Sequence, residues 1–407
     1  MASTTSISPS QLDLLCRVCN LPTAPYREDF VSAYIRAWAA QPQRTNYLHM
    51  RTDRWGNIYL DYRRGLKPKR VLILEAHMDH PGFIIKRQNR DGTLKAEFLG
   101  GVPPSHFRHA RVGIWNPSGF SADAVPIGRW IQTQVINVKP AKGKIPVIVD
   151  LAGVQEKIPP GSIGMWALPD AQVIGELFAA RVCDDLAGLA ACLCVLDELI
   201  TRKSTCALTV LFTRAEEVGF AGAIAAVRSG AASEKISIIG LETSKALPHA
   251  PQGNGPIIRV GDRTSIFSSS LTRFITMRAG AIADQDAGFK FQRHLMDGGT
   301  CDTTVFSAFG YDAAAICVAL GNYHNMLQNQ PAGNMGIPAA GPMIASETIH
   351  LGDFASLVRI LVQIAVDFRQ YRPNLSDLVK RFSNMHREGQ RARLLMHGCS
   401  RTPLTGK

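Results

Sequence analysis

The chain of 407 residues lacks a long apolar run. A membrane-spanning helix needs about 18 or more consecutive uncharged apolar residues, so the sequence predicts no such helix. Residues 1–15 contain no basic segment followed by an apolar core, so we expect no secretory signal. Glycine and proline, with 35 and 23 residues, are not abundant enough for a disordered or fibrous protein. We therefore expect a globular protein that is not secreted.

A pattern of paired cysteines is absent as well. The nine cysteines are odd in number and scattered along the chain, so we interpret them as reduced thiols. Cys16 and Cys19 are separated by two residues, but no second pair lies nearby and both fall in a helical pattern. We interpret this pair as helix packing. Reduced thiols and the missing signal together predict a cytoplasmic location.

Acidic residues are fewer than basic ones, with 33 Asp and Glu against 45 Lys and Arg and a net charge of +12. The positive charge is spread along the chain but is dense near the C-terminus. The basic residues there are Lys380, Arg381, Arg387, Arg391, Arg393, Arg401 and Lys407. We interpret this segment as a solvated basic tail. A phosphate-rich partner is the alternative, but we expect no nucleic-acid partner.

The chain is longer than one compact core, so we expect two domains. Short alternating strands over 85–177 predict a small β-barrel or sandwich. Strands alternating with helices on either side of it predict an α/β fold: a mostly parallel sheet with helices on both faces. The predicted division is an α/β domain in two parts, 1–85 and 178–371, an inserted β-barrel domain at 86–177 and a basic tail at 372–407.

The apolar run at residues 71–74 predicts a strand buried on both faces, as in a parallel sheet. In open α/β sheets the ligand site lies just beyond the carboxyl ends of such strands. His77 and Asp79 follow this strand. His77 can offer a ring nitrogen to a metal ion, and Asp79 can accept the other ring N–H and so fix the orientation of the imidazole.

Further ligand-type side chains follow the later predicted strands or begin a predicted helix. These candidates are Asp184, Glu216, Glu217, Glu242 and His324. Each has an ordinary explanation when taken alone: Asp184 or Asp185 could cap a helix, and adjacent glutamates are usually solvated charge. The recurrence of histidines and carboxylates at one rim of a sheet instead favours a metal site.

The number of candidates is enough for two metal ions. One catalytic zinc ion needs three protein ligands and an open position, and five ligands serve two ions if one carboxylate bridges them. Two ions about 3.5 to 4 Å apart can share a water molecule, lower its pKa and polarise a carbonyl group. Glu216 and Glu217 are adjacent and point in different directions, so one can bind a metal while the other takes the proton from the water.

The order of the motifs HMD, DDLAG, EEVGFAGA, LETS, GGTCD and NYH resembles that of the dinuclear aminopeptidases of the glutamyl and deblocking type, whose larger members build tetrahedral assemblies. The resemblance spans residues 9–370. It implies a zinc-peptidase-like fold and two divalent ions, Zn²⁺ or Co²⁺. It also implies that His77 and Glu242 bind one ion, that Glu217 and His324 bind the other, and that Asp184 bridges them.

The same resemblance implies that Glu216 is the general base and that Asp79 supports His77. Three features of the chain depart from the family pattern. His80 stands where the family commonly has glutamate, and Glu242 stands where its aminopeptidases usually have aspartate. Residues 298–302 read GGTCD where the family has GGTD. Glutamate at the position of Glu242 is familiar in related carboxypeptidases and N-acyl-amino-acid deacylases.

The leading expectation is a metallopeptidase that removes N-terminal residues from peptides. The alternatives are a carboxypeptidase or deacylase with the same dinuclear site, and a catalytically weak basic scaffold protein. The resemblance further implies a homo-oligomer that assembles through the inserted β domain. The expected partners are thus a peptide substrate and further copies of the chain.

Overall fold

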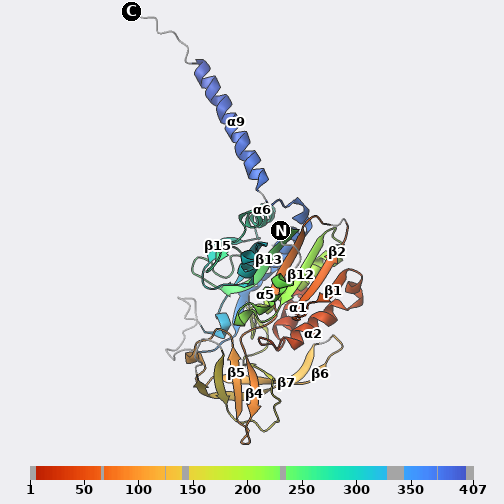
Figure 1. Ribbon diagram of the computed structural model, residues 1–407, viewed down its shortest axis with the longest axis vertical. Helices are drawn as coiled ribbons and strands as arrows, with labels where there is room; N and C mark the ends of the chain where they lie inside the picture. Colours follow the sequence, from red (N-terminus) through yellow and green to blue (C-terminus); the bar gives the residue numbers. More distant parts are fainter. Residues whose placement is uncertain are drawn as a thin grey trace, which may run out of the picture. The chain divides into compact units, whose positions relative to one another are not determined.

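The computed structural model describes residues 6–65, 68–123, 125–139, 146–229, 235–327, 343–373 and 375–399. Two compact units divide the chain, one over Met1–Arg369 and one over Gln370–Lys407. The first unit contains a large sheet, its covering helices and a closed β-barrel (Figure 1). The predicted α/β class with an inserted β-barrel is confirmed.

The large sheet has eight strands, and its four central strands run parallel to one another. An antiparallel hairpin extends one edge, and β14 runs antiparallel to β16 near the other. In spatial order the strands are β1 (Leu48–Thr52), β2 (Ile58–Arg63), β12 (Ala207–Thr213), β3 (Val71–His77), β13 (Ile236–Lys245), β16 (Asp312–Leu320), β14 (Ile257–Asp262) and β15 (Gln292–Met296). The central strands are almost wholly buried, as the apolar runs predicted.

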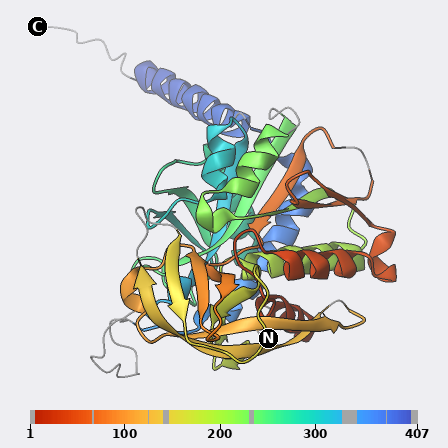
Figure 2. The ribbon, with the colours of Figure 1, turned by 60° about the horizontal axis from the view of Figure 1, so that its bottom comes forward.

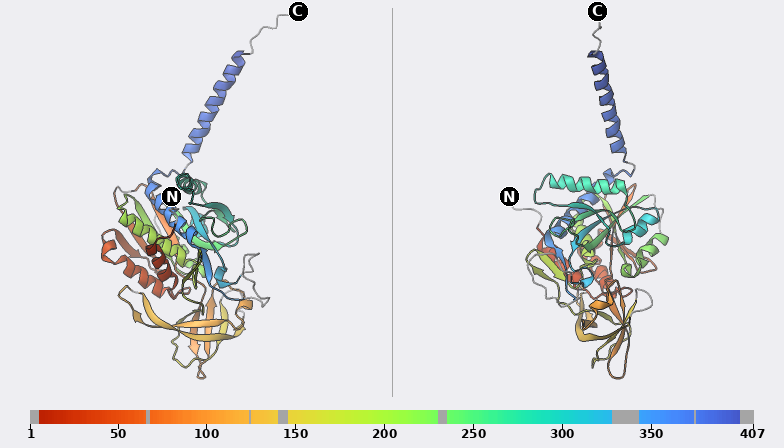
Figure 3. Two further views of the ribbon diagram at one scale, coloured as in Figure 1. Left: turned by 180° about the vertical axis from the view of Figure 1, so that it is seen from behind. Right: turned by 90° about the vertical axis from the view of Figure 1, so that its left-hand side faces the viewer.

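Helices cover both faces of this sheet (Figures 2 and 3). Alternate residues of the central strands point to opposite faces, and Ile73, Leu211 and Ile238 share an apolar cluster with residues of α5 and α7. The helices α1, α4 and α8 pack as a separate group against the sheet. The helices of this unit are α1 (Pro9–Cys19), α2 (Asp29–Ala39), α3 (Pro42–Thr45), α4 (Leu186–Thr201), α5 (Ala221–Arg228), α6 (Ser269–Ala283), α7 (Asp302–Ala308) and α8 (Leu351–Asp367).

The central helix α4 begins at Leu186, one or two residues later than the sequence predicted. Its small side chains, among them Gly188, Ala190 and Ala191, are fully buried and allow close packing against the sheet. Asp185 occupies the N-cap position, but its side chain makes no capping hydrogen bond. The acidic pair before this helix therefore does not serve as its cap, and Asp184 is left available for another role.

The barrel closes through six strands around an aromatic core. Phe83, Phe98, Phe107 and Trp166 are fully buried in it and pack edge to face. In order around the barrel the strands are β4 (Gly82–Gln88), β5 (Leu94–Leu99), β8 (Val147–Leu151), β7 (Pro126–Lys139), β6 (Arg111–Phe120) and β9 (Ile163–Trp166). The predicted boundary at residue 86 falls inside β4. The division into domains stays a prediction.

A small antiparallel sheet was not predicted from the sequence. It consists of β10 (Gln172–Ile174), β11 (Leu177–Ala180) and β17 (Glu347–His350). In the register of β11 and β17, Glu347 lies opposite Ala180. This pairing brings Glu347 beside the segment that leads to Asp184.

The described residues of the second unit, 370–373 and 375–399, include the helix α9 (Ser376–Cys399), where the sequence predicted only a basic tail. Val379, Phe382 and Met385 are exposed on it. Within the described part of the chain, no helix combines the length and the apolar character needed to cross a bilayer.

Candidate metal centre

The candidate ligands come from four neighbouring strands of the large sheet and from the start of α4. His77 is the last residue of β3, and Glu216 and Glu217 follow β12 in the 3₁₀ turn η2 (Glu216–Val218). His324 follows β16 in the turn η4 (Tyr323–Asn325). The prediction that Glu242 follows the end of its strand is wrong, because Glu242 lies within β13. The strand is longer than predicted because its pairing with β16 continues to Lys245.

The structure brings all of the predicted ligands together. Two sets of three residues share Asp184: one set adds His77 and Glu242, and the other adds Glu217 and His324. Within each set, one ligand atom per residue lies within 4.8 Å of the others. The two oxygens of the Asp184 carboxylate face different histidines, at 3.5 Å from Nε2 of His77 and 3.7 Å from Nε2 of His324.

A third set combines His77 with Glu216 and Glu217 within the same limit. Glu216 can therefore approach one of the positions that a metal ion would occupy.

Backbone carbonyl groups orient both histidine rings. Nδ1 of His77 lies 3.0 Å from the carbonyl oxygen of Asp79, and Nδ1 of His324 lies 3.2 Å from that of Gly101. A carbonyl oxygen can only accept a hydrogen bond, so Nδ1 carries a proton and Nε2 is the ring nitrogen that faces the carboxylates. The prediction for Asp79 is corrected in one respect: its backbone oxygen is the closest acceptor, whereas its carboxylate oxygen is 3.5 Å from the ring nitrogen.

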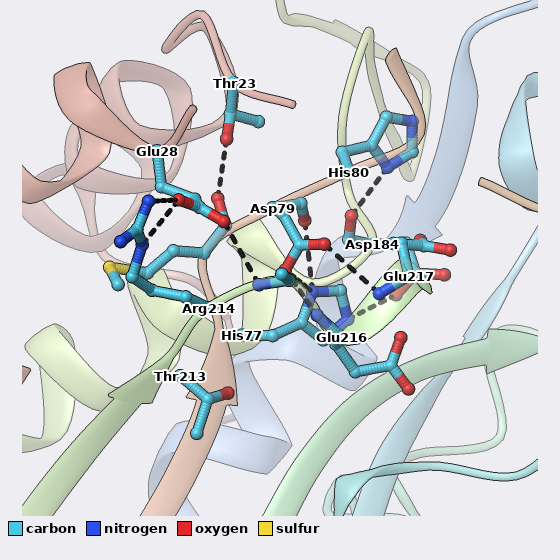
Figure 4. A network of polar contacts seen from close by, with 12 residues as sticks. Thr23, Glu28, His77, Asp79, His80, Asp184, Thr213, Arg214, Glu216 and Glu217 are labelled. Carbon is cyan, nitrogen blue, oxygen red and sulfur yellow. Dashed lines mark hydrogen bonds and ion pairs between the residues drawn. The ribbon is translucent and has the colours of Figure 1, made fainter. Parts of the chain in front are cut away.

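The carboxylate of Asp79 instead holds the glutamate turn. One oxygen accepts the backbone N–H of Glu216 at 2.9 Å, and the other accepts that of Glu217 at 3.1 Å (Figure 4). Ala215, just before this turn, has a left-handed φ of 53° and donates its N–H to Glu28 at 3.1 Å. The sequence analysis missed Glu28. Two buried carboxylates thus fix the backbone from which Glu216 and Glu217 project.

The buried acidic groups shift one another's pKa values. Burial, followed by the charge of Asp184, raises the pKa of Glu242 to about 8. Burial acts to lower the pKa of His324, but the neighbouring Glu217 raises it to about 9. Burial likewise opposes the charged form of His77, and the nearby carboxylates of Asp184 and Asp79 raise its pKa well above the usual value. Each carboxylate thus opposes the ionisation of its acidic neighbours in this buried site and favours the protonated form of the histidines.

Two oxygens in this cluster lack a hydrogen-bond partner among the described residues. They are Oδ1 of Asp184 and Oε1 of Glu217, and both are fully buried. A buried carboxylate oxygen without a partner is costly, and coordination of a cation removes that cost. Two imidazole lone pairs and several carboxylates form the mixed N and O donor set that suits zinc and similar divalent ions. The residues present therefore fit such ions.

A pocket of about 90 Å³ opens beside the cluster. It is lined by the candidate ligands Asp184, Glu217, Glu242 and His324, by Glu216, and by Thr243, Ser244, Lys245, Leu247, Arg259, Met296, Gly298, Gly299, Thr300, Cys301 and Tyr323. The pocket therefore combines the acidic cluster with two cationic side chains.

Arg259 is the unusual residue of this pocket and was not predicted. It is only 3% exposed, and its Nη1 donates to Oγ of Ser244 at 3.2 Å. Its Nε is buried without a hydrogen-bond partner among the described residues, and the charges of Glu242 and Asp262 act on the guanidinium without a direct ion pair. A buried cation of this kind is suited to bind a carboxylate of a ligand.

A second layer of carboxyl groups lies beneath His77. Oγ1 of Thr213 is 2.8 Å from Glu75 and 2.8 Å from Asp302, and burial raises the pKa of Asp302 to about 6. The sequence analysis assigned no role to either acid. Glu75 interrupts an otherwise apolar buried strand, and that interruption is a signal that could have marked it.

Comparisons with known proteins agree with the class of enzyme that this fold and site define, a metallopeptidase. The family model described as M42 glutamyl aminopeptidase matches residues 56–330. The chain therefore belongs to the M42 glutamyl aminopeptidase family, and the resemblance seen in its motifs is confirmed. The prediction of a peptidase is confirmed with it. Among curated proteins, no relative matches the chain.

Two of the solved structures with the same fold come from archaea. The TET1 peptidase of Pyrococcus horikoshii, which can assemble into a tetrahedron or a large octahedral shell, is 18% identical with a TM-score of 0.66; the match covers 87% of this chain and 99% of that one. An aminopeptidase from Desulfurococcus kamchatkensis is 19% identical with a TM-score of 0.67, over 88% and 95% of the two chains. At these identities the likeness shows the fold.

Proposed function

We propose that this chain is a metal-dependent aminopeptidase that hydrolyses the first peptide bond of its substrates with a water molecule activated at a dinuclear site. The observation that carries the proposal is the Asp184 carboxylate, whose two oxygens face Nε2 of two different histidines. A carboxylate between two sets of ligands is the arrangement that two neighbouring divalent ions require. Membership of an aminopeptidase family supports the same conclusion.

The proposed ligands are His77 and Glu242 for one ion, Glu217 and His324 for the other, and Asp184 for both. Two of the three observed ligand sets match this division. When bound, the ions, Zn²⁺ or Co²⁺, would lower the pKa of the water molecule and polarise the scissile carbonyl group.

Glu216 is the proposed general base. It lines the pocket, and it is the one acidic residue of the three ligand sets that this division leaves free. Asp79 fixes the backbone N–H groups of Glu216 and Glu217, so the two carboxylates keep separate directions. Glu216 takes the proton from the attacking water and delivers it to the leaving amine, so one side chain serves both transfers.

The pocket favours substrates with an acidic first residue. Arg259 offers a buried guanidinium without a carboxylate partner, and Lys245 adds a second cation to the same pocket. A glutamate or aspartate side chain supplies the missing carboxylate and forms a charge-assisted hydrogen bond with the guanidinium.

The same arginine favours a second candidate function. A free α-carboxylate at the C-terminal end of a substrate would also satisfy Arg259, as a carboxypeptidase or an N-acyl-amino-acid deacylase requires. Glu242 points in the same direction, because the sequence has glutamate where aspartate is usual in the aminopeptidases.

Product analysis separates these functions. The enzyme, supplied with Zn²⁺ or Co²⁺, is given the peptides Glu-Ala-Phe with either a free or an acetylated N-terminus and either a free or an amidated C-terminus. Release of glutamate from the amidated peptide with a free N-terminus is expected, and it establishes the aminopeptidase. A requirement for the free carboxylate, or cleavage of the acetylated peptide alone, moves the protein to the second class. A chain that binds no metal and cleaves none of them supports the scaffold alternative.

We further infer that the chain forms a homo-oligomer through the β-barrel, which the sequence analysis assigned to residues 86–177. The assembly described for the P. horikoshii peptidase supports this. The mass of the full-length protein in solution tests it, and a monomer at micromolar concentration would contradict it. A cytoplasmic location stays a prediction.

A further inference from the structure

Glu347, on β17, is a fully buried carboxylate that lines no part of the pocket and contacts the backbone of two candidate ligands. Its Oε2 accepts the backbone N–H groups of Cys183 at 2.7 Å and Asp184 at 3.0 Å. Its Oε1 accepts the backbone N–H of His324 at 2.9 Å. One side chain therefore joins the turn that carries Asp184 to the turn that carries His324.

The turn at His324 depends on such support. His324 has φ 54° and ψ 35°, and Asn325 has φ 60°, so two successive residues occupy the left-handed region. Residues with a side chain disfavour this region, and they persist there only when surrounding contacts hold them. The hydrogen bond from the His324 N–H to Glu347 is one such contact, and the N–H of Ala345 bonded to the carbonyl oxygen of Asn325 at 2.8 Å is another.

His80 joins the same two turns through the carbonyl oxygen of Asp184 and the side chain of Asn325. Its Nδ1 lies 2.7 Å from the carbonyl oxygen of Asp184, and its Nε2 lies 3.0 Å from Oδ1 of Asn325. The amide of Asn325 is oriented by its own donation to the carbonyl oxygen of Arg181 at 2.9 Å. The N–H of Asp184 thus bonds to Glu347 and its carbonyl oxygen to His80. The turn cannot move without breaking one of these contacts.

We propose that Glu347 is a positioning residue that sets the spacing between Asp184 and His324, and thereby the affinity of the Glu217 and His324 position for its metal ion. The inference rests on the dinuclear function proposed above. Glu347 touches neither the pocket nor a candidate ligand atom, so it acts through the backbone. Residues that orient metal ligands in this indirect way typically change metal affinity by about 10- to 100-fold when they are replaced.

The substitution Glu347→Gln tests the proposal because it keeps the contact with one turn and removes the contact with the other. The glutamine oxygen can still accept from Cys183 and Asp184, but its NH₂ group then faces the N–H of His324, and two donors oppose each other. We expect one of the two dissociation constants, that of the Glu217 and His324 position, to rise about tenfold or more, while the other changes less than about threefold. Glu176→Gln is the matched control, since the side chain of Glu176 is 88% exposed.

The measurement is equilibrium dialysis of the full-length protein against Co²⁺, with bound metal counted by mass spectrometry and the visible absorption of Co²⁺ recorded. Two unchanged dissociation constants in Glu347→Gln overturn the positioning role. A wild-type protein that binds no ions overturns the dinuclear function instead, so the two failures are distinguishable. Should Glu347→Gln not fold, Glu347→Asp carries the test, because it keeps both acceptors on a shorter side chain. Two unchanged dissociation constants in that variant are equally decisive.

Discussion

Replacing Arg259 by methionine tests the proposed preference for an acidic first residue. Methionine retains much of the length of the arginine side chain and removes its charge and all its donors. Arg259 lines the pocket, is almost fully buried, and has an Nε without a partner among the described residues. The variant therefore removes the cation that we expect to bind the substrate carboxylate.

The expected magnitude follows from the hydrogen bond that is lost. A hydrogen bond to a charged group contributes about 1.5–3 kcal/mol, and about 1.4 kcal/mol corresponds to a factor of ten. We therefore expect kcat/KM for a peptide that begins with glutamate to fall by about 10- to 150-fold. A peptide that begins with alanine places no carboxylate near Arg259, so its kcat/KM should change by less than about threefold. The free energy of unfolding should fall by no more than about 1 kcal/mol, because among the described residues the side chain makes one hydrogen bond, to Ser244.

The assay compares kcat/KM for Glu-Ala-Phe-amide and Ala-Ala-Phe-amide at saturating metal. Arg263→Met is the control, because Arg263 lies close in sequence to Arg259 but is exposed. Equal losses for both peptides would show that Arg259 supports the site and does not select the substrate. An unchanged ratio with full activity would refute the proposed recognition.

Three further predictions concern the acidic cluster and its surroundings. Glu216→Gln should lower kcat by about 10²- to 10⁴-fold with metal content unchanged, and retained turnover would exclude Glu216 as base. His324→Ala should reduce bound metal from two ions per chain to one; two ions by mass spectrometry would contradict its role as ligand. Burial, together with the charge of Asp79, raises the pKa of Glu28 to about 7 from its ordinary value of 4.5. The folded chain therefore binds this proton more tightly than the unfolded chain, and stability should fall as the pH rises from about 5 to 7. Urea unfolding should show a smaller fall in Glu28→Gln, and an equal fall in both proteins would refute the assignment.

The residues that provide ligand atoms were predictable because their positions follow from strand ends. A buried apolar run has a clear end, and parallel strands end at the same edge, so His77 and Glu217 could be predicted to lie together. Glu242 was also found, although the strand continues past it. The length of β13 depends on its pairing with β16, which no local pattern reveals.

The supporting residues were harder to predict because their partners are distant in the sequence. Glu347 lies on a four-residue strand, and its role depends on the pairing of β17 with β11. No local pattern distinguishes Arg259 from other basic residues in the sequence. Its burial without a carboxylate partner among the described residues is visible only in the packed structure. A role for Asp79 was predicted, but its main role is to accept the backbone N–H groups of Glu216 and Glu217. These residues lie 137 and 138 positions further along the chain.

The backbone contacts of Asp79 and Glu347 have a consequence for how this site can change. Both carboxylates hold the metal-centre turns through main-chain N–H groups, which every residue except proline possesses. These hydrogen bonds therefore do not depend on the side chains at the positions whose N–H groups they hold. Substitutions at positions 184, 216, 217 and 324 can alter the choice of metal or the reaction while the turns keep their shape. The same turns can therefore carry other sets of metal ligands.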